Sequence, residues 1–140
     1  MDKKEALKFW KNGGDIDKIP NHFLKDKSFM IELVKINGAM LSYADKSLKK
    51  DKSLVLAAIK ENGQSLEYAD ESLKKDKSIV LEAVKKHGLA LEYAHDSLKK
   101  DKSIVMAAIK SPGGGGGVAF KYAHKSLQND LELIELADKD

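Results

Sequence analysis

The sequence predicts an all-α protein, an array of about five 25-residue two-helix repeats in a short α-solenoid or curved helical stack. Two observations predict this fold class. The motif Asp-Lys-Ser recurs every 25 residues, at 26–28, 51–53, 76–78 and 101–103. Glycine keeps the same interval, at Gly38, Gly63, Gly88 and Gly113. Units 51–75 and 76–100 share 16 of 25 residues, which chance does not produce.

The repeat divides the chain into six segments of one helical-repeat domain, residues 1–140. These are a degenerate unit 1–25, regular units 26–50, 51–75 and 76–100, unit 101–129 with a glycine insertion at Gly113–Gly117, and a C-terminal capping helix 130–140. Because of the insertion, Tyr122 follows Tyr93 by 29 residues rather than 25. One pair of short helices cannot bury its apolar face alone, so the stacked array is the expected folding unit.

Each unit begins with a helix whose two ends are marked in the sequence. Asp51 and Asp76 are N-cap candidates, because their carboxylates can accept hydrogen bonds from the free amides of the first turn. Residues 54–59 are all apolar, which predicts a helix buried on most sides. Gly63 and Gly88 lie where a glycine in the left-handed conformation would end the helix.

A shorter second helix follows in each unit. In unit 51–75 it is expected at residues 66–69, with Leu73 one turn later. Leu66, Ala69 and Leu73 are spaced i, i+3 and i+7, which places them on one face. The following Ser-Leu-Lys-Lys stretch is expected to be a tight turn that leads into the next Asp cap.

Composition excludes several classes of site. All 25 basic residues are lysines, against 22 acidic residues, and the net charge is +3. The chain has no cysteine, so a disulfide framework, a zinc finger and an iron–sulfur site are excluded. It has no arginine, the residue that usually reads guanine edges or clamps phosphates. No apolar run approaches the roughly 20 residues of a membrane span, and no signal peptide is recognised, so the expected compartment is the cytoplasm.

Two sets of repeated residues are candidates for binding a partner. The first, the tyrosine column, consists of Tyr43, Tyr68, Tyr93 and Tyr122. The second, the lysine edge, consists of Lys50, Lys75 and Lys100. The tyrosines are interpreted either as packing residues between units or as an aromatic stripe that binds a peptide. The lysines are interpreted either as a solvated edge or as a surface that attracts polyanions.

The remaining candidates favour structural roles. His95 and His124 share one repeat position, but nothing else supports a metal site there, and no cofactor is expected. Serines recur once per unit near the helix starts and again in the turn, whereas a nucleophilic serine is normally singular, so we expect no enzyme activity. Trp10 aligns with Lys35 at the 25-residue spacing, and we expect it to help cover the first full repeat.

The unit Asp-Lys-Ser-Ile-Val-Leu-x-Ala-Val-Lys-x-x-Gly-x-x-Leu-Glu-Tyr-Ala-x-x-Ser-Leu-Lys-Lys resembles the short helical repeats grouped as domain of unknown function 4116. The resemblance covers residues 26–110 strongly and continues more weakly to about 129. It implies a helical repeat and supplies no catalytic residues. The glycine insertion departs from the family pattern.

These observations favour an interaction module that binds another macromolecule through its surface, with a protein as the expected partner. The first alternative is weak, sequence-independent binding of nucleic acid or anionic lipid through the lysine edge. An enzyme is the least favoured alternative.

Overall fold

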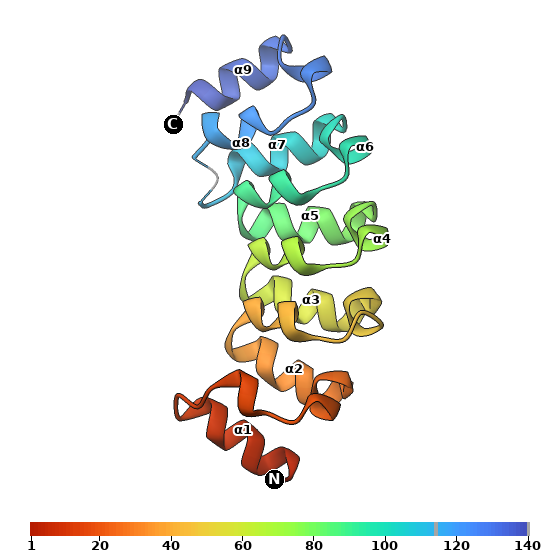
Figure 1. Cartoon of the computed structure of the whole chain (residues 1–140). Coiled ribbons are helices and arrows are strands. Elements are labelled where there is room, and N and C mark those ends of the chain that lie inside the picture. The colour runs from red at the N-terminus through yellow and green to blue at the C-terminus, as the bar shows by residue number, and fades with distance from the viewer. Residues whose placement is uncertain (114, 140) are drawn as a thin grey trace.

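A computed structural model describes residues 1–113 and 115–139. Figure 1 shows an elongated stack of helical units, in which the first and last units lie at opposite ends. Over the described residues every regular element is a helix, so the predicted helical repeat array is confirmed.

The first helix of each unit is an α-helix that stacks on its counterpart in the next unit. These helices are α1 (Lys3–Lys11), α2 (Lys27–Ile36), α3 (Lys52–Glu61), α5 (Lys77–Lys86), α7 (Lys102–Lys110) and α9 (Leu131–Asp138). In α3, Leu54, Val55, Ala58 and Ile59 are at most 1% exposed. Burial of this stripe between neighbouring helices removes the apolar surface that a single unit would leave in water.

The second helix of each regular unit is a 3₁₀ helix followed by a short helical turn. The 3₁₀ helices are η3 (Gly38–Tyr43), η5 (Gly63–Tyr68) and η6 (Gly88–Tyr93). The turns are η4 (Leu48–Lys50), α4 (Glu71–Lys74) and α6 (Asp96–Lys99). The irregular units add η1 (Ile16–Lys18), η2 (Asn21–Lys25), α8 (Gly117–Lys121) and η7 (Lys125–Leu127).

The predicted aspartate N-caps are confirmed. One carboxylate oxygen of Asp51 accepts a hydrogen bond from the N–H of Leu54 at 3.0 Å, and Asp76 accepts from Ile79 at 3.3 Å. The serine two positions after each cap donates its hydroxyl to the same oxygen, at 2.7 Å for Ser53. The motif Asp-Lys-Ser is therefore a helix-start signal.

The prediction that the glycines repeated every 25 residues end the helices was wrong. Among the described residues, positive φ angles occur only at glycines outside the regular units, so Gly63 and Gly88 do not end helices in the left-handed conformation. Gly63 instead begins η5, and a Cβ atom there would collide with the carbonyl oxygen of Ala83 in the next unit. Gly38 approaches the carbonyl oxygen of Ala58 in the same way. These glycines are needed because neighbouring units approach closely.

The first unit is one residue shorter between caps than the regular units. Asp2 caps α1 and Asp26 caps α2, a spacing of 24. Trp10 therefore corresponds to the buried Val34, and its alignment with Lys35 was wrong. Trp10 packs, partly buried, against the core together with Leu7 and Phe9, as expected for a unit that covers the first full repeat.

Successive units are connected by repeated contacts, and we call the contacts between two neighbouring units a join. Each join contains an ion pair from the first lysine of one α-helix to the aspartate cap of the next. The five pairs are Lys3–Asp26 (2.6 Å), Lys27–Asp51 (3.0 Å), Lys52–Asp76 (3.2 Å), Lys77–Asp101 (2.8 Å) and Lys102–Asp130 (3.0 Å). Four joins also contain a backbone hydrogen bond between units, such as the one from the N–H of Asp70 to the carbonyl of Lys49 at 3.0 Å.

The glycine insertion leaves the last two joins in place. The N–H of His124 donates to the carbonyl of Lys99 at 3.0 Å, although these residues lie on either side of the insertion. The ion pair between Lys102 and Asp130 is also kept, at 3.0 Å. Within the expected insertion Gly114 lies outside the described residues, as does Asp140 at the end of the expected capping helix.

Candidate functional site

The tyrosine column lies where the second helices end. Tyr43, Tyr68 and Tyr93 are the last residues of η3, η5 and η6, and Tyr122 directly follows α8. Tyr43 is 42% exposed, whereas the other three are half-buried against the core. Tyr68, Tyr93 and Tyr122 therefore pack in part between units, as the packing interpretation expects, and part of each residue faces solvent.

The structure brings one residue of each candidate set together. A hollow of about 510 Å³ beside η5 is lined by Tyr68 and Lys50, together with Lys46, Lys49, Glu67, Ala69, Asp70 and Glu71. One unit earlier, Tyr43 lines a hollow of about 230 Å³ with Lys25, which corresponds to Lys50. We call these two depressions the tyrosine hollows. Lys75 and Lys100 are exposed at the equivalent positions of the following units.

The charges around the hollow of Tyr68 balance. Lys46, Lys49 and Lys50 face the carboxylates of Glu67, Asp70 and Glu71. In the next unit, burial raises the pKa of Tyr93, and the negative charges of Glu67 and Glu92 raise it further. The Tyr93 phenol therefore stays protonated at neutral pH and can act as a hydrogen-bond donor. The hollow of Tyr68 therefore carries no excess of either charge.

One lysine of each lysine cluster forms an ion pair, which the sequence did not indicate. Lys52, Lys77 and Lys102 each belong to a Lys-Lys-Asp-Lys cluster, and each is paired with the next aspartate cap. These pairs neutralise one lysine of each cluster. The residues of the lysine edge lie outside these joins and remain exposed.

The repeated serines and histidines that follow the tyrosines make hydrogen bonds to each other or to aspartate within short turns. Ser72 donates its N–H and its hydroxyl to Asp70, at 3.0 and 2.7 Å. His95 takes the place of Asp70 in the next unit, where its Nδ1 accepts from the N–H of Ser97 at 3.1 Å. His124 repeats this arrangement with Ser126 at 3.0 Å. In residues 1–113 and 115–139, no three His, Asp or Glu side chains are grouped so that they could hold a metal ion.

The sequence did not reveal that the two candidate sets meet across units. Lys50 closes one unit, and Tyr68 belongs to the next. An alignment of repeats places equivalent residues in columns, but it contains no signal for how far one column is offset from another after stacking. Lys46 and Glu71 were missed for the same reason, although both lie in the hollow.

Four overlapping segments of the chain match one family model, the domain of unknown function DUF4116, at residues 4–49, 26–74, 51–98 and 76–113. The chain belongs to the DUF4116 family. Each of the first three matches covers almost two units, so the DUF4116 domain corresponds to a pair of stacked repeats. A search of curated proteins and a search of solved structures found no match to this chain.

None of the helices in the described parts of this DUF4116 array has the length and apolarity needed to cross a bilayer. Its longest helices, α2, α3 and α5, have 10 residues each.

Proposed function

We propose that this DUF4116 array is an interaction module that binds another protein, and that the tyrosine hollows are its contact surface. The observation that carries the proposal is the hollow in which Tyr68 lies among three lysines, one of them Lys50, and three carboxylates. Aromatic residues are enriched at protein interfaces, where a ring can bury large area while its hydroxyl keeps a polar partner.

Charge balance favours a protein over a polyanion. Binding of nucleic acid or anionic lipid draws its free energy from an excess of positive charge. The hollow of Tyr68 has no such excess, since each lysine is matched by one carboxylate. A protein surface offers both charge signs together with apolar area, and it can satisfy all of these groups at once.

The experiment compares proteins captured by three forms of the chain from its native cells. These are the unaltered chain, the double variant Tyr43→Ala with Lys50→Glu, and the control Leu131→Ala. Tyr43 is 42% exposed and Leu131 is 75% exposed, so neither substitution removes core packing. We expect one protein to be retained by the unaltered chain and the control at about 0.5 M salt, where exposed charges are strongly screened.

The double variant should lose that protein while keeping its circular dichroism and its unfolding temperature. Capture that disappears for every form at high salt, or that recovers nucleic acid rather than protein, would support the polyanion alternative instead. Equal capture by the double variant and the control would contradict the assignment to the tyrosine hollows.

The same proposal assigns the function to the surface and not to a catalytic group. The support is that the repeated serines and the histidines His95 and His124 already act as partners in turns. We also propose a cytoplasmic location, which the absence of cysteine favours. Fluorescence microscopy of the tagged chain in its native cell tests the location.

A further inference from the structure

A second surface, which shares no residue with the tyrosine hollows, runs across the α-helices of the stack. It contains two rows at equivalent positions of successive helices. The aliphatic row consists of Ile31, Leu56, Leu81 and Met106, all half-buried against the core. The groove lysines are Lys35, Lys60, Lys85 and Lys110, all exposed. Each lysine follows its aliphatic residue by four positions, so the two lie on the same side of one helix.

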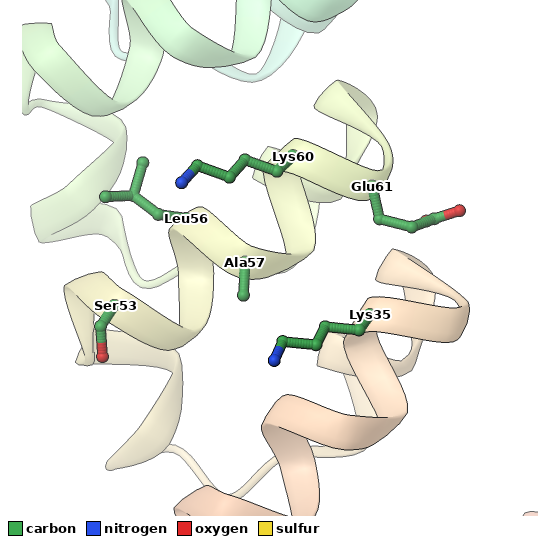
Figure 2. Close-up of a pocket in the computed structure, with 6 residues that line it drawn as sticks. All are labelled: Lys35, Ser53, Leu56, Ala57, Lys60 and Glu61. Carbon is green, nitrogen blue, oxygen red and sulfur yellow. The ribbon is translucent and has the colours of Figure 1, made fainter.

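Three groove lysines and Leu56 of the aliphatic row line two depressions between neighbouring helices. Between α2 and α3, a depression of about 480 Å³ is lined by Lys35, Ser53, Leu56, Ala57, Lys60 and Glu61, and Figure 2 shows Lys35 and Lys60 on these two helices with Leu56 and Ala57. Between α3 and α5, a second depression of about 390 Å³ is lined by Lys60, Lys85, Lys86, Ile59 and Glu82. Lys60 lines both depressions, so they adjoin at this residue, and we call the two together the groove.

The groove has an excess of positive charge. Four lysines and two carboxylates line the two depressions, and a third carboxylate, that of Glu32, lies beside Lys35. One of these carboxylates, that of Glu61, already accepts a hydrogen bond from the N–H of Gly38. Among the described residues, Lys35 has an ion pair with Glu32 at 4.0 Å, and no ion pair is found for Lys60, Lys85 or Lys86. The charge complementary to this groove is therefore negative.

We propose that this groove binds an acidic segment of a partner protein in the polyproline II conformation, with an acidic residue at every third position. The stacked helices lie about 8–10 Å apart, as packed helices do, so the groove lysines repeat at that interval. A polyproline II chain rises about 3.1 Å per residue with three residues per turn, so side chains on one edge repeat about every 9.3 Å. Successive acidic side chains can then meet successive groove lysines, while the adjacent residue of each turn contacts the aliphatic row.

The aliphatic row favours this occupant over single-stranded nucleic acid. Proteins that bind single strands combine a basic groove with aromatic side chains on which the bases stack. The residues that line the two depressions include no aromatic ring. The half-buried side chains of Leu56 and Ala57 suit the apolar residues of a peptide. This inference goes beyond the proposed function, because it concerns a different surface and a different test.

The test uses two labelled peptides of equal composition and charge. The first contains four repeats of Glu-Leu-Pro, and the second contains the same residues with its four glutamates placed together. Binding is measured by fluorescence anisotropy with the full chain. We expect the repeating peptide to bind about tenfold more tightly, because only its acidic residues keep the spacing of the groove lysines.

Two double variants locate the binding surface. Lys60→Glu with Lys85→Glu should weaken binding of the repeating peptide by about tenfold or more, since two favourable charge pairs become repulsive. Lys50→Glu with Lys75→Glu makes the same change of net charge on the lysine edge and should leave the affinity within about twofold. All four lysines are exposed, so both variants should fold, which circular dichroism confirms.

Three results would overturn the inference. One is equal affinity for the two peptides, and another is equal loss in the two double variants, since either result indicates unspecific charge attraction. The third is tighter binding of a 12-nucleotide oligo(dT) through Lys60 and Lys85 than of the repeating peptide. The tyrosine hollows contain neither Lys60 nor Lys85. A negative result with the peptides therefore does not contradict the proposed function. Likewise, unchanged capture by the Tyr43 and Lys50 variant does not contradict peptide binding in the groove.

Discussion

At the scale of single residues, one capping position differs between otherwise equivalent units. Asn37 and Asn62 begin the 3₁₀ helices η3 and η5, and their side chains accept hydrogen bonds from the N–H groups of Ala39 and Gln64, at 3.0 Å each. His87 takes this place before η6 with nearly the same backbone angles, φ −152° and ψ 108°, but its side chain makes no capping bond. The first turn of η6 therefore lacks the hydrogen bond to a side chain that backbone N–H groups donate in η3 and η5.

The substitution His87→Asn should raise the free energy of unfolding by about 0.5–1 kcal/mol, because asparagine restores the missing cap. Urea denaturation followed by circular dichroism measures the change. The reverse substitution Asn62→His is the matched control, and it should lower the free energy of unfolding by a similar amount. A loss of stability in His87→Asn would show that the contact of the His87 ring with Gln64 is worth more than the cap.

Residue patterns could predict the caps but not the ion pairs. The Asp-Lys-Ser motif identified the aspartate caps because the capping bonds are local, two or three residues away. Lys52 directly follows Asp51 in the sequence, yet it pairs with Asp76 of the next unit at 3.2 Å. That choice depends on how the helices stack, and no local pattern contains this information.

At the scale of elements, the second helix shows what a spacing pattern cannot distinguish. Leu66 and Ala69 predicted a helix with one apolar face; Leu66 is buried within η5, and Ala69 is buried directly after its end. A spacing of three residues fits a 3₁₀ helix as well as an α-helix, since side chains at i and i+3 eclipse in the 3₁₀ form. Over six residues the pattern could therefore predict a helix but not its type.

The glycine at the start of this helix supplies the second prediction. Gly63→Ala should lower the free energy of unfolding by about 1–3 kcal/mol, because its Cβ atom would force the carbonyl of Ala83 and the adjoining unit to move. Thermal unfolding measures the change. This outcome opposes the usual effect of replacing glycine by alanine, which stabilises by about 0.4–1 kcal/mol where the backbone permits it.

Gly117→Ala is the control for that substitution. Gly117 begins α8, and a Cβ atom there would meet nothing within 4 Å. Its replacement should leave stability unchanged or raise it slightly. If Gly63→Ala behaves like Gly117→Ala, close approach between units does not explain the repeated glycine.

At the scale of the whole molecule, the repeat allowed the architecture to be predicted, but the offset between units had to come from the structure. The 25-residue interval was sufficient to predict a helical array and the order of its units. The hollow shared by Tyr68 and Lys50, and the two depressions that adjoin at Lys60, all involve residues of neighbouring units. Such contacts depend on the distance and angle between packed helices, which a sequence repeat does not encode.

The aspartates of the joins make the stability of the array depend on pH in the acidic range. The ion pair with Lys77 and the hydrogen bond from Ser103 lower the pKa of Asp101 to about 2. Burial acts to raise the pKa of Asp51, but hydrogen bonds from Ser53, Leu54 and Lys27 outweigh it and lower the pKa to about 2. The other caps of the joins, Asp26, Asp76 and Asp130, also have lowered pKa values.

A lowered pKa in the folded state means that folding favours the carboxylate, so the caps stabilise the array above their ordinary pKa of 3.8. This stabilisation is lost as the pH falls through the folded-state values. We expect the unfolding temperature to fall steeply between about pH 4 and pH 2, as protons bind to several caps in the same range. Thermal unfolding at a series of pH values measures it.

Asp51→Asn is the control for the acid effect. It removes one titrating cap, so its unfolding temperature should be lower at neutral pH and should fall less between about pH 4 and pH 2 than that of the unaltered chain. An unfolding temperature that stays level over this range would contradict a stabilising role for the carboxylates of the joins.

The joins also determine how the molecule would respond to tension. Because the first and last units lie at opposite ends of the stack, a pull on those ends passes through every join in series. Links in series share one force and add their extensions, so the array would stretch more easily for each unit that it contains. The backbone hydrogen bond that His124 donates to Lys99 preserves the contact between units across the glycine insertion.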